Sequence, residues 1–202
     1  MRFSFLLPVC LLLTACSDTP TETKTKEPEK PSAPITGRQG FQSTFPAARL
    51  WAADCQPLRI RSITLAEVKS EEGKSGAWEI FYVSASRNAA KIFTWSAAET
   101  DGNLHKGVFK GEEQSWSGTS GQERPFDSTA IQVDSPAALQ TAIAAAKEYL
   151  SKPGTKPQVN FLLEFTPRFP DPVWRVLWGQ SAGVAEFTVF VDASTGKVVG
   201  KG

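Results

Sequence analysis

Residues 173–199 read VWRVLWGQSAGVAEFTVFVDASTGKVV and carry the clearest structural pattern in this chain. Two apolar stretches, 173–178 and 187–191, are rich in the β-branched and aromatic residues that strands prefer, and small polar residues separate them. After the second stretch, Asp192 is suited to accept hydrogen bonds from backbone N–H groups ahead of it, and Gly196 is suited to a positive φ. The pattern predicts antiparallel strands joined by tight turns.

A helix is predicted immediately before these strands. Ser135 is a capping residue followed by Pro136, which favours the first turn of a helix. Apolar residues then recur at helical spacing at Leu139, Ala142, Ile143, Ala146 and Leu150. With a further strand after Pro157, residues 135–202 predict one helix packed on a three-stranded antiparallel meander.

The same landmarks occur earlier in the chain, 90 to 100 residues upstream. Pro46 is expected to open a short helix over about 46–55, as Pro136 does in the later copy. Trp78 begins a predicted strand, as Trp174 does 96 residues later. We therefore predict an α+β fold of two tandem units, each a helix on a three-stranded meander.

The later copy resembles a known family. Trp174-Arg175-Val176, followed by the strand and turn over 189–199, is similar to the PepSY domain of thermolysin-type peptidase propeptides and related secreted or membrane-anchored modules. The resemblance covers about 135–202 and implies a small cystatin-like unit outside the cytoplasm that binds or restrains peptidases, without an active site. It is weaker over 45–102, where Ala97 stands at the Asp position, so the first unit is expected to be a degenerate PepSY-like copy.

The N-terminus has the features of a secretory signal. The apolar run 3–13 is about eleven residues long, short of the roughly twenty that a membrane-spanning helix needs. Leu13-Thr14-Ala15-Cys16 resembles the bacterial lipobox, which implies that Cys16 is multiply acylated and becomes the new N-terminus. Ser17 stands where inner-membrane retention signals usually carry Asp, which favours the outer membrane, facing the periplasm. An ordinary signal peptide with a chance cysteine is the alternative.

Residues 17–40 contain four prolines and many charges, and almost no apolar side chains. Such a segment buries too little surface to offset the entropy of ordering it, so a disordered tether is predicted. The expected organisation is a signal peptide (1–15), a lipidated Cys and disordered tether (16–40), a first PepSY-like unit (41–102), a connecting loop with at most one short strand (103–134) and a second PepSY-like unit (135–202).

Charge and composition exclude several functions. With 22 basic and 21 acidic side chains, the chain lacks the broad basic field of a general nucleic-acid binder. Cys10 leaves with the signal peptide and Cys16 is acylated, so Cys55 is the remaining thiol, expected to be buried and inert; a reactive or dimer-forming thiol is the alternative. One histidine without metal-ligand spacing predicts no metal and no cofactor.

Gly179 to Gly183 match the G-x-S-x-G motif of α/β-hydrolases. That motif works at a strand-to-helix turn, whereas predicted strands flank it here, and the sole histidine, His105, lies upstream in a polar loop. We interpret the motif as a hairpin turn. A lipid-anchored serine hydrolase using Ser181 is kept as the alternative.

Tryptophans are the main candidates for a contact surface. Trp78 and Trp174 recur at matched positions and are expected in the core. Trp95, Trp116 and Trp178 have no such match, and we predict them as partner-binding residues.

Arg59 and Arg61 alternate along a predicted strand, as a small basic stripe or an ordinary exposed face. Together these features predict a non-enzymatic lipoprotein, attached to the membrane by its lipid, that contacts an envelope protein or peptide, with restraint of a protease as one expected role. The further alternative is a structural or assembly lipoprotein with no ligand groove.

Overall fold

The computed structural model describes residues 31–100, 102, 104–119, 123–153 and 158–202. The predicted signal peptide, the lipobox with Cys16 and the tether up to residue 30 lie outside the described residues. No helix among the described residues is long and apolar enough to cross a membrane.

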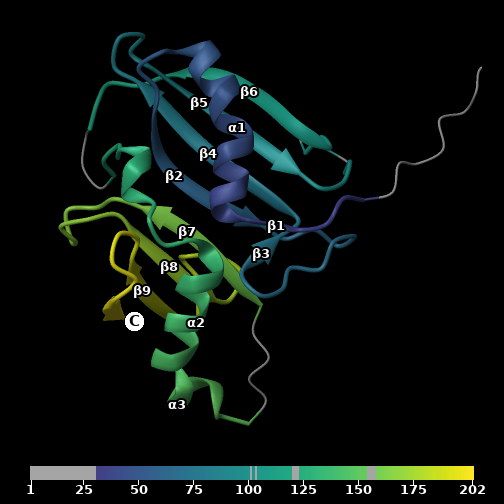
Figure 1. The fold of residues 1–202 in the computed structure, drawn as a ribbon, viewed down its shortest axis with the longest axis vertical. Helices are drawn as coiled ribbons and strands as arrows, with labels where there is room; N and C mark the ends of the chain where they lie inside the picture. The colour runs from purple at the N-terminus through teal and green to yellow at the C-terminus, as the bar shows by residue number, and fades with distance from the viewer. Residues whose placement is uncertain (1–30, 101, 103, 120–122, 154–157) are drawn as a thin grey trace, which may run out of the picture.

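One antiparallel sheet of eight strands forms the body of the molecule, in the order β10-β9-β8-β7-β2-β4-β5-β6 (Figure 1). Its strands are β2 (Gln56–Ile63), β4 (Ala77–Ser84), β5 (Ala89–Ser96), β6 (Gly107–Ser115), β7 (Val159–Glu164), β8 (Val173–Trp178), β9 (Phe187–Asp192) and β10 (Val198–Lys201). A separate short pairing joins β1 (Ile35–Thr36) to β3 (Lys74–Ser75).

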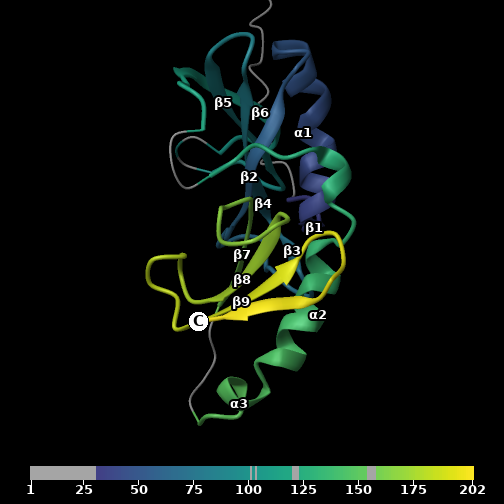
Figure 2. The same cartoon turned by 90° about the vertical axis from the view of Figure 1, so that its left-hand side faces the viewer.

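The helices are α1 (Gly37–Trp51), α2 (Ser135–Ala145) and α3 (Lys147–Leu150), with a 3-10 turn, η1 (Ser128–Ala130). Figure 2 shows α1 and α2 against the same face of the sheet. Helix α1 packs on β2, β4 and β5, and α2 packs on β8 and β9. In the described part of the chain the opposite face carries no helix, and we call it the helix-free face. The architecture is a two-layer α+β fold.

Alternation along the strands separates the two faces. In β4, the side chains of Trp78, Ile80 and Tyr82 are fully buried in the core beneath the helices. Glu79 and Phe81 alternate with them and lie on the helix-free face. The core therefore lies between the helices and one face of the sheet.

The sheet has two halves that meet at β2 and β7. These strands pair antiparallel, with Ile60 opposite Leu163. Helix α1 with β2, β4, β5 and β6 lies on one side of this seam, and α2 with β7, β8, β9 and β10 lies on the other. One continuous sheet thus spans both halves.

Each half has four main strands, where the sequence predicted a three-stranded meander. Strand β6 lies in the segment 103–134, which was expected to be mainly a connecting loop. The sequence of β6, GVFKGEEQS, is largely polar, and its side chains are mostly exposed because it is an edge strand. It therefore lacks the apolar alternation that identifies a half-buried strand.

The start of α1 also differs from the prediction. The helix begins at Gly37, inside the segment expected to be a disordered tether, instead of near Pro46. Thr36 and Gln39 form a capping box, each side chain accepting a hydrogen bond from the backbone N–H of the other residue. Pro46 lies inside the helix at an exposed position. Proline has no N–H to donate to the carbonyl one turn earlier in the helix, and at an exposed position water is able to donate to that carbonyl instead.

The turn after β9 forms as predicted. The Asp192 carboxylate accepts hydrogen bonds from the backbone N–H groups of Ser194, at 2.9 Å, and Thr195, at 2.7 Å. Gly196 has a φ of +72°, which glycine adopts without steric cost. The chain then pairs back on β9 as β10.

Two tryptophans fasten the helices to the centre of the sheet. The rings of Trp78 in β4 and Trp174 in β8 meet edge to face, with centroids 6.3 Å apart. Trp78 Nε1 donates a hydrogen bond to the Ile35 carbonyl at 2.9 Å, and Trp174 Nε1 donates one to the Val133 carbonyl at 2.8 Å. Each carbonyl lies two residues before the first residue of a helix. The expectation that both tryptophans are core residues is confirmed.

The two helices begin side by side because they share capping groups. Asp134 Oδ1 accepts hydrogen bonds from the backbone N–H groups of Ser135, at 2.7 Å, and Arg38, at 2.9 Å. Ser135 Oγ accepts one from the Gly37 N–H at 2.8 Å. The first turn of α1 is therefore capped partly by residues of the other half.

Small residues let α1 approach the indole rings. A Cβ atom at Gly40 would lie 2.7 Å from Trp78 Cγ, and one at Gly37 would lie 2.6 Å from Trp174 Cη2. Both distances are shorter than van der Waals contact. Larger side chains at these positions would push the helix away from the sheet.

We expect Trp174→Phe to lower the free energy of unfolding by about 1–3 kcal/mol, because the Val133 carbonyl loses its buried donor and a cavity opens beside Trp78. Urea denaturation followed by circular dichroism measures the change. Leu50→Ala is the control, because Leu50 is 86% exposed on α1; it should change stability by less than about 0.5 kcal/mol. A Trp174→Phe variant as stable as the wild type would contradict a central role for this side chain.

Candidate functional site

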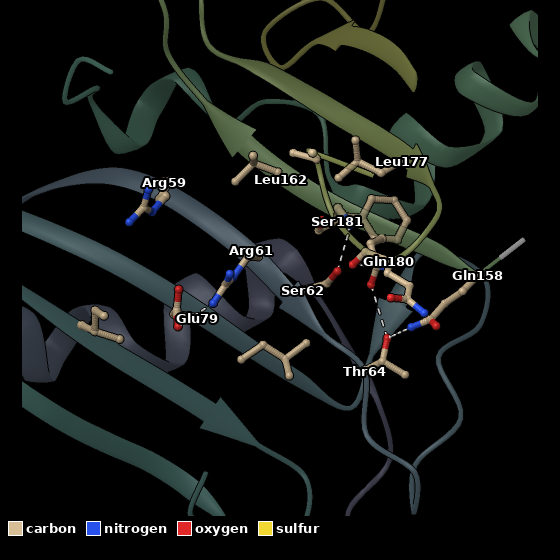
Figure 3. A pocket seen from close by; sticks show the side chains of 16 residues that line it. Arg59, Arg61, Ser62, Thr64, Glu79, Gln158, Leu162, Leu177, Gln180 and Ser181 are labelled. Atoms are coloured by element: carbon tan, nitrogen blue, oxygen red, sulfur yellow. Dashed lines mark hydrogen bonds and ion pairs between the residues drawn. The ribbon is translucent and has the colours of Figure 1, made fainter. Parts of the chain in front are cut away.

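The helix-free face is hollowed where the two halves of the sheet meet. A groove of about 790 Å³ lies there, lined by β2, β4, β5, β7 and β8 and by residues 180–183 of the loop between β8 and β9 (Figure 3). This volume is in the range of known ligand sites. We call it the seam groove.

A row of directly opposed residues crosses the seam on this face. It consists of Glu79, Arg61, Leu162, Arg175 and Phe190, on β4, β2, β7, β8 and β9. Opposed residues of antiparallel strands project to the same side of a sheet. Charged and apolar side chains from both halves therefore form one surface.

Three ion pairs lie on this surface, each with an arginine in a strand of the sheet. They are Arg61–Glu79 at 3.0 Å, Arg59–Glu123 at 3.1 Å and Arg175–Glu164 at 3.0 Å. Glu79 and Glu164 come from neighbouring strands, whereas Glu123 comes from the segment that links the two halves. The glutamates thus orient the guanidinium groups on the sheet.

Phenylalanine rings also position these arginines. The Arg59 guanidinium lies 4.9 Å from the centroid of the Phe81 ring, and the Arg175 guanidinium lies 5.4 Å from that of Phe190. Arg168, from the loop between β7 and β8, lies 4.6 Å from the same Phe190 ring. Such contacts are favourable and restrict the orientation of the guanidinium plane.

The wall of the groove is held in place from β7. Asn160 Nδ2 donates hydrogen bonds to the carbonyls of Gly179, at 2.7 Å, and Gln180, at 3.4 Å. Asn160 Oδ1 accepts one from Thr64 Oγ1 at 3.3 Å, and Gln158 Nε2 donates to the same hydroxyl. Asn160 thus fixes the loop between β8 and β9 to the seam. Figure 3 shows the Gln158–Thr64 hydrogen bond beside it.

Ser181 lies in this loop and is exposed. The loop joins two strands of a hairpin, so Ser181 is not at a strand-to-helix turn. His105 lies in the loop between β5 and β6, where its Nδ1 is 2.6 Å from Glu99 Oε1. Among the hydrogen bonds of the described residues, none joins the Ser181 side chain to a histidine or a carboxylate. The geometry gives no support to a hydrolase using Ser181.

The three predicted contact tryptophans are not brought together. Trp178 is 2% exposed and lies in the core beside Tyr149, so the expectation that it is available at the surface is wrong; its position in β8 turns it toward the helices. Trp95 is partly buried at the border of the main core. Trp116 packs against a small apolar cluster, separate from that core, formed by β2, β4 and β5. A partner role for Trp95 and Trp116 stays a prediction.

Cys55 is buried and unpaired, as expected. Burial raises the pKa of its thiol, which disfavours the reactive thiolate. No group of three possible metal-ligating side chains occurs among the residues that the structure describes.

A second polar cluster lies at the end of β4. The Asp54 carboxylate accepts hydrogen bonds from Ser84 Oγ at 2.7 Å and from the backbone N–H and the Oγ of Ser86, both at 2.9 Å. These bonds, with Ser84 contributing most, lower the pKa of Asp54 from 3.8 to about 2. The arrangement ties the end of α1 to the turn after β4.

Arg59 and Arg61 were recognisable in the sequence, but their ion-pair partners were not. The available signal was a charged side chain at alternate positions of an otherwise apolar strand, as at Glu79 and Arg175. Asn160 carried no such signal, because its role depends on a loop that follows the next strand.

Residues 136–201 match the family described as "Peptidase propeptide and YPEB domain", so α2 through β10 form a PepSY domain. A crystal structure from Clostridium difficile 630, described as that of a "putative lipoprotein", has a similar fold, with a TM-score of 0.53. The two chains are 10% identical, and the likeness covers 86% of this chain and 95% of the other. It therefore extends beyond the part that matches the family. No curated protein matches this chain.

Asn160→Ala is expected to lower the free energy of unfolding by about 1–3 kcal/mol, because the partly buried carbonyls of Gly179 and Gln180 lose their donor. Hydrogen exchange of the loop amides over 180–186 should accelerate at the same time. Gln140→Ala, at an exposed position on α2, is the control and should change neither. Unchanged exchange in the loop would show that Asn160 does not hold it.

The Asp54 carboxyl should titrate near pH 2 in a carbon-13 NMR experiment. Because its pKa is lower in the folded than in the unfolded state, its contribution to stability is complete above about pH 4 and is lost as the pH falls toward 2. Ser84→Ala removes the largest cause of the shift and should raise the pKa toward 3.8. An unchanged pKa in that variant would contradict the assignment.

Proposed function

We propose that this protein is a non-enzymatic binding module, anchored to the bacterial cell envelope by a lipid, that holds a segment of another envelope protein in the seam groove. The observation that carries the proposal is the groove itself, with a volume of about 790 Å³ on the helix-free face and walls from both halves of the sheet. A structural or assembly lipoprotein would not require such a groove.

The family of the second half suggests which class of partner to expect. Its description names peptidase propeptides, which are segments that accompany peptidases. We propose that the partner is an envelope peptidase, or a protein that such a peptidase acts on, and that binding restrains proteolysis.

The anchor is proposed to be Cys16, acylated in the lipobox. Support comes from the short apolar run before it and from the description of the structural neighbour as a lipoprotein. With Ser17 following it, we place the protein in the outer membrane, facing the periplasm. Near the start of the described chain, the Ser32 N–H donates a hydrogen bond to the Ala97 carbonyl at 2.8 Å, which joins this segment to the residue after β5.

We further propose that the first half is a diverged copy of the PepSY domain. Both halves have a helix followed by four main strands in the same order. Trp78 and Trp174 lie in the second main strand of each half, and each donates a hydrogen bond to the residue before the helix cap. The family match itself covers only the second half.

Site-specific photo-cross-linking in living cells tests the binding role. A photoreactive amino acid at Gln180, on the rim of the groove, should give discrete protein adducts. The same amino acid at Gln140, an exposed glutamine on α2 beneath the opposite face of the sheet, should not. Identical adducts from both positions, or none from Gln180, would overturn the proposal.

A blocking variant links any adduct to the groove. Ala182→Trp places a bulky side chain at an exposed position that lines the groove, and should abolish the Gln180 adduct without unfolding the chain. If mass spectrometry identifies a peptidase, the full-length wild-type protein should slow its hydrolysis of a protein substrate, and Ala182→Trp should not. If the wild type and Ala182→Trp slow the peptidase equally, the groove is not the contact surface.

A further inference from the structure

We infer that the segment held in the seam groove is an acidic, extended peptide with acidic side chains at positions i and i+2 and an apolar side chain at i+4. This inference rests on the proposed binding function and adds the chemistry of the occupant. It follows from three features of the helix-free face: exposure, donor capacity and spacing.

The first feature is unequal exposure within the ion pairs. The side chain of Arg61 is 54% exposed, whereas that of its partner Glu79 is 15% exposed. The same order holds for the other two pairs, with 37% against 26% for Arg59–Glu123 and 22% against 9% for Arg175–Glu164. In each pair the glutamate side chain is therefore less exposed than the arginine side chain. Arg59, Arg61 and Glu79 are the charged residues that line the groove, so a ligand entering it meets two arginines and one less exposed glutamate.

The second feature is unused hydrogen-bonding capacity. In each pair the arginine donates from a single terminal nitrogen, Nη1 or Nη2, to its glutamate. A guanidinium carries five N–H donors. The arginines thus retain donors for a carboxylate, which they bind in a planar, often bidentate geometry.

These donors are also pre-positioned. The Phe81 ring lies under Arg59, one of the two arginines that line the groove. Side chains that are already restrained lose less rotamer entropy when a ligand binds. An anionic ligand therefore gains more from Arg59 than from a free arginine at the surface.

The third feature is the spacing along β2. Arg59, Arg61 and Ile63 occupy alternate positions of this strand, and all three line the groove. Alternate residues of a strand are about 6.6–6.8 Å apart, which is also the spacing of alternate side chains in any extended peptide. A peptide lying along β2 would place two acidic side chains over the arginines and an apolar one over Ile63. Leu162 and Leu177 extend that apolar floor across the seam.

The shape of the site favours a peptide over other anions. The arginines lie in a groove walled by residues 180–183, which a flat membrane surface does not enter. Amide side chains of Gln158 and Gln180 line the same groove and suit the polar backbone of a peptide.

Fluorescence anisotropy with two labelled peptides tests the inference on the full-length chain in detergent. The probe GESESLG carries the predicted pattern, and GKSKSLG is its matched opposite. We expect the acidic peptide to bind, the basic one not to bind, and added salt to weaken binding. Arg61→Gln should weaken it by roughly tenfold or more, as expected for one charge-assisted hydrogen bond.

Arg87→Gln is the matched control, because Arg87 is also a half-exposed arginine in an ion pair, with Glu113, but does not line the groove. It should leave peptide affinity unchanged. Equal binding of both peptides, or no loss in Arg61→Gln, would overturn the inference. The inference would also be overturned if the protein bound phosphatidylglycerol vesicles through Arg61 and did not bind the acidic peptide.

The outcome is separable from that of the proposed function. Suppose that Gln180 cross-links a protein, and that Ala182→Trp abolishes this adduct whereas Arg61→Gln leaves it unchanged. In that case the binding role stands and the acidic occupant is wrong. If Gln180 yields no adduct and neither peptide binds, both fail.

Discussion

The edge-to-face contact between Trp78 and Trp174 is the interaction on which the rest of the fold depends. Each ring is fully buried, and each indole N–H holds the backbone just before a helix. The two rings therefore fix the position of both helices relative to one sheet and join the two halves beneath them. Gly37 and Gly40 are consequences of this contact, because a side chain at either position would collide with a ring.

Placing both helices on one face determines what the other face presents. That face is left to arginine, glutamate, phenylalanine and leucine side chains, arranged in register across the seam. The sheet edges are less open to a partner. Strands β6 and β10 form the two edges, and the pairing of each with its neighbour contains a register shift. Such irregularities discourage further strands from adding to an edge. The face, more than the edges, is the surface of this protein that is suited to binding.

Local features of the second half were predictable from the sequence. The strands β8 and β9, the start of α2 behind Ser135–Pro136 and the turn at Asp192 and Gly196 all follow from short-range patterns. Pro46 misled because its preference for a first turn is only statistical, and an exposed position tolerated it inside α1. Strand β6 was underestimated because an edge strand needs little apolar surface. Trp178 was wrongly predicted at the surface from its polar neighbours. It lies in the same strand as Trp174, an even number of residues away, so both side chains project to the helix-covered face.

The α+β class of the fold, the strands and the Asp192 turn of the second half, and the burial of Trp78 and Trp174 could be predicted from the sequence, because they depend on periodicity and turn chemistry over a few residues. The pairing of β2 with β7 could not be predicted in this way, because it joins residues far apart in the sequence. The Phe161 N–H, for example, donates a hydrogen bond to Ser62 Oγ across 99 positions. The seam groove exists only through that pairing. It brings Arg61 of one half beside Leu162 of the other, and no pattern within either half encodes such a contact.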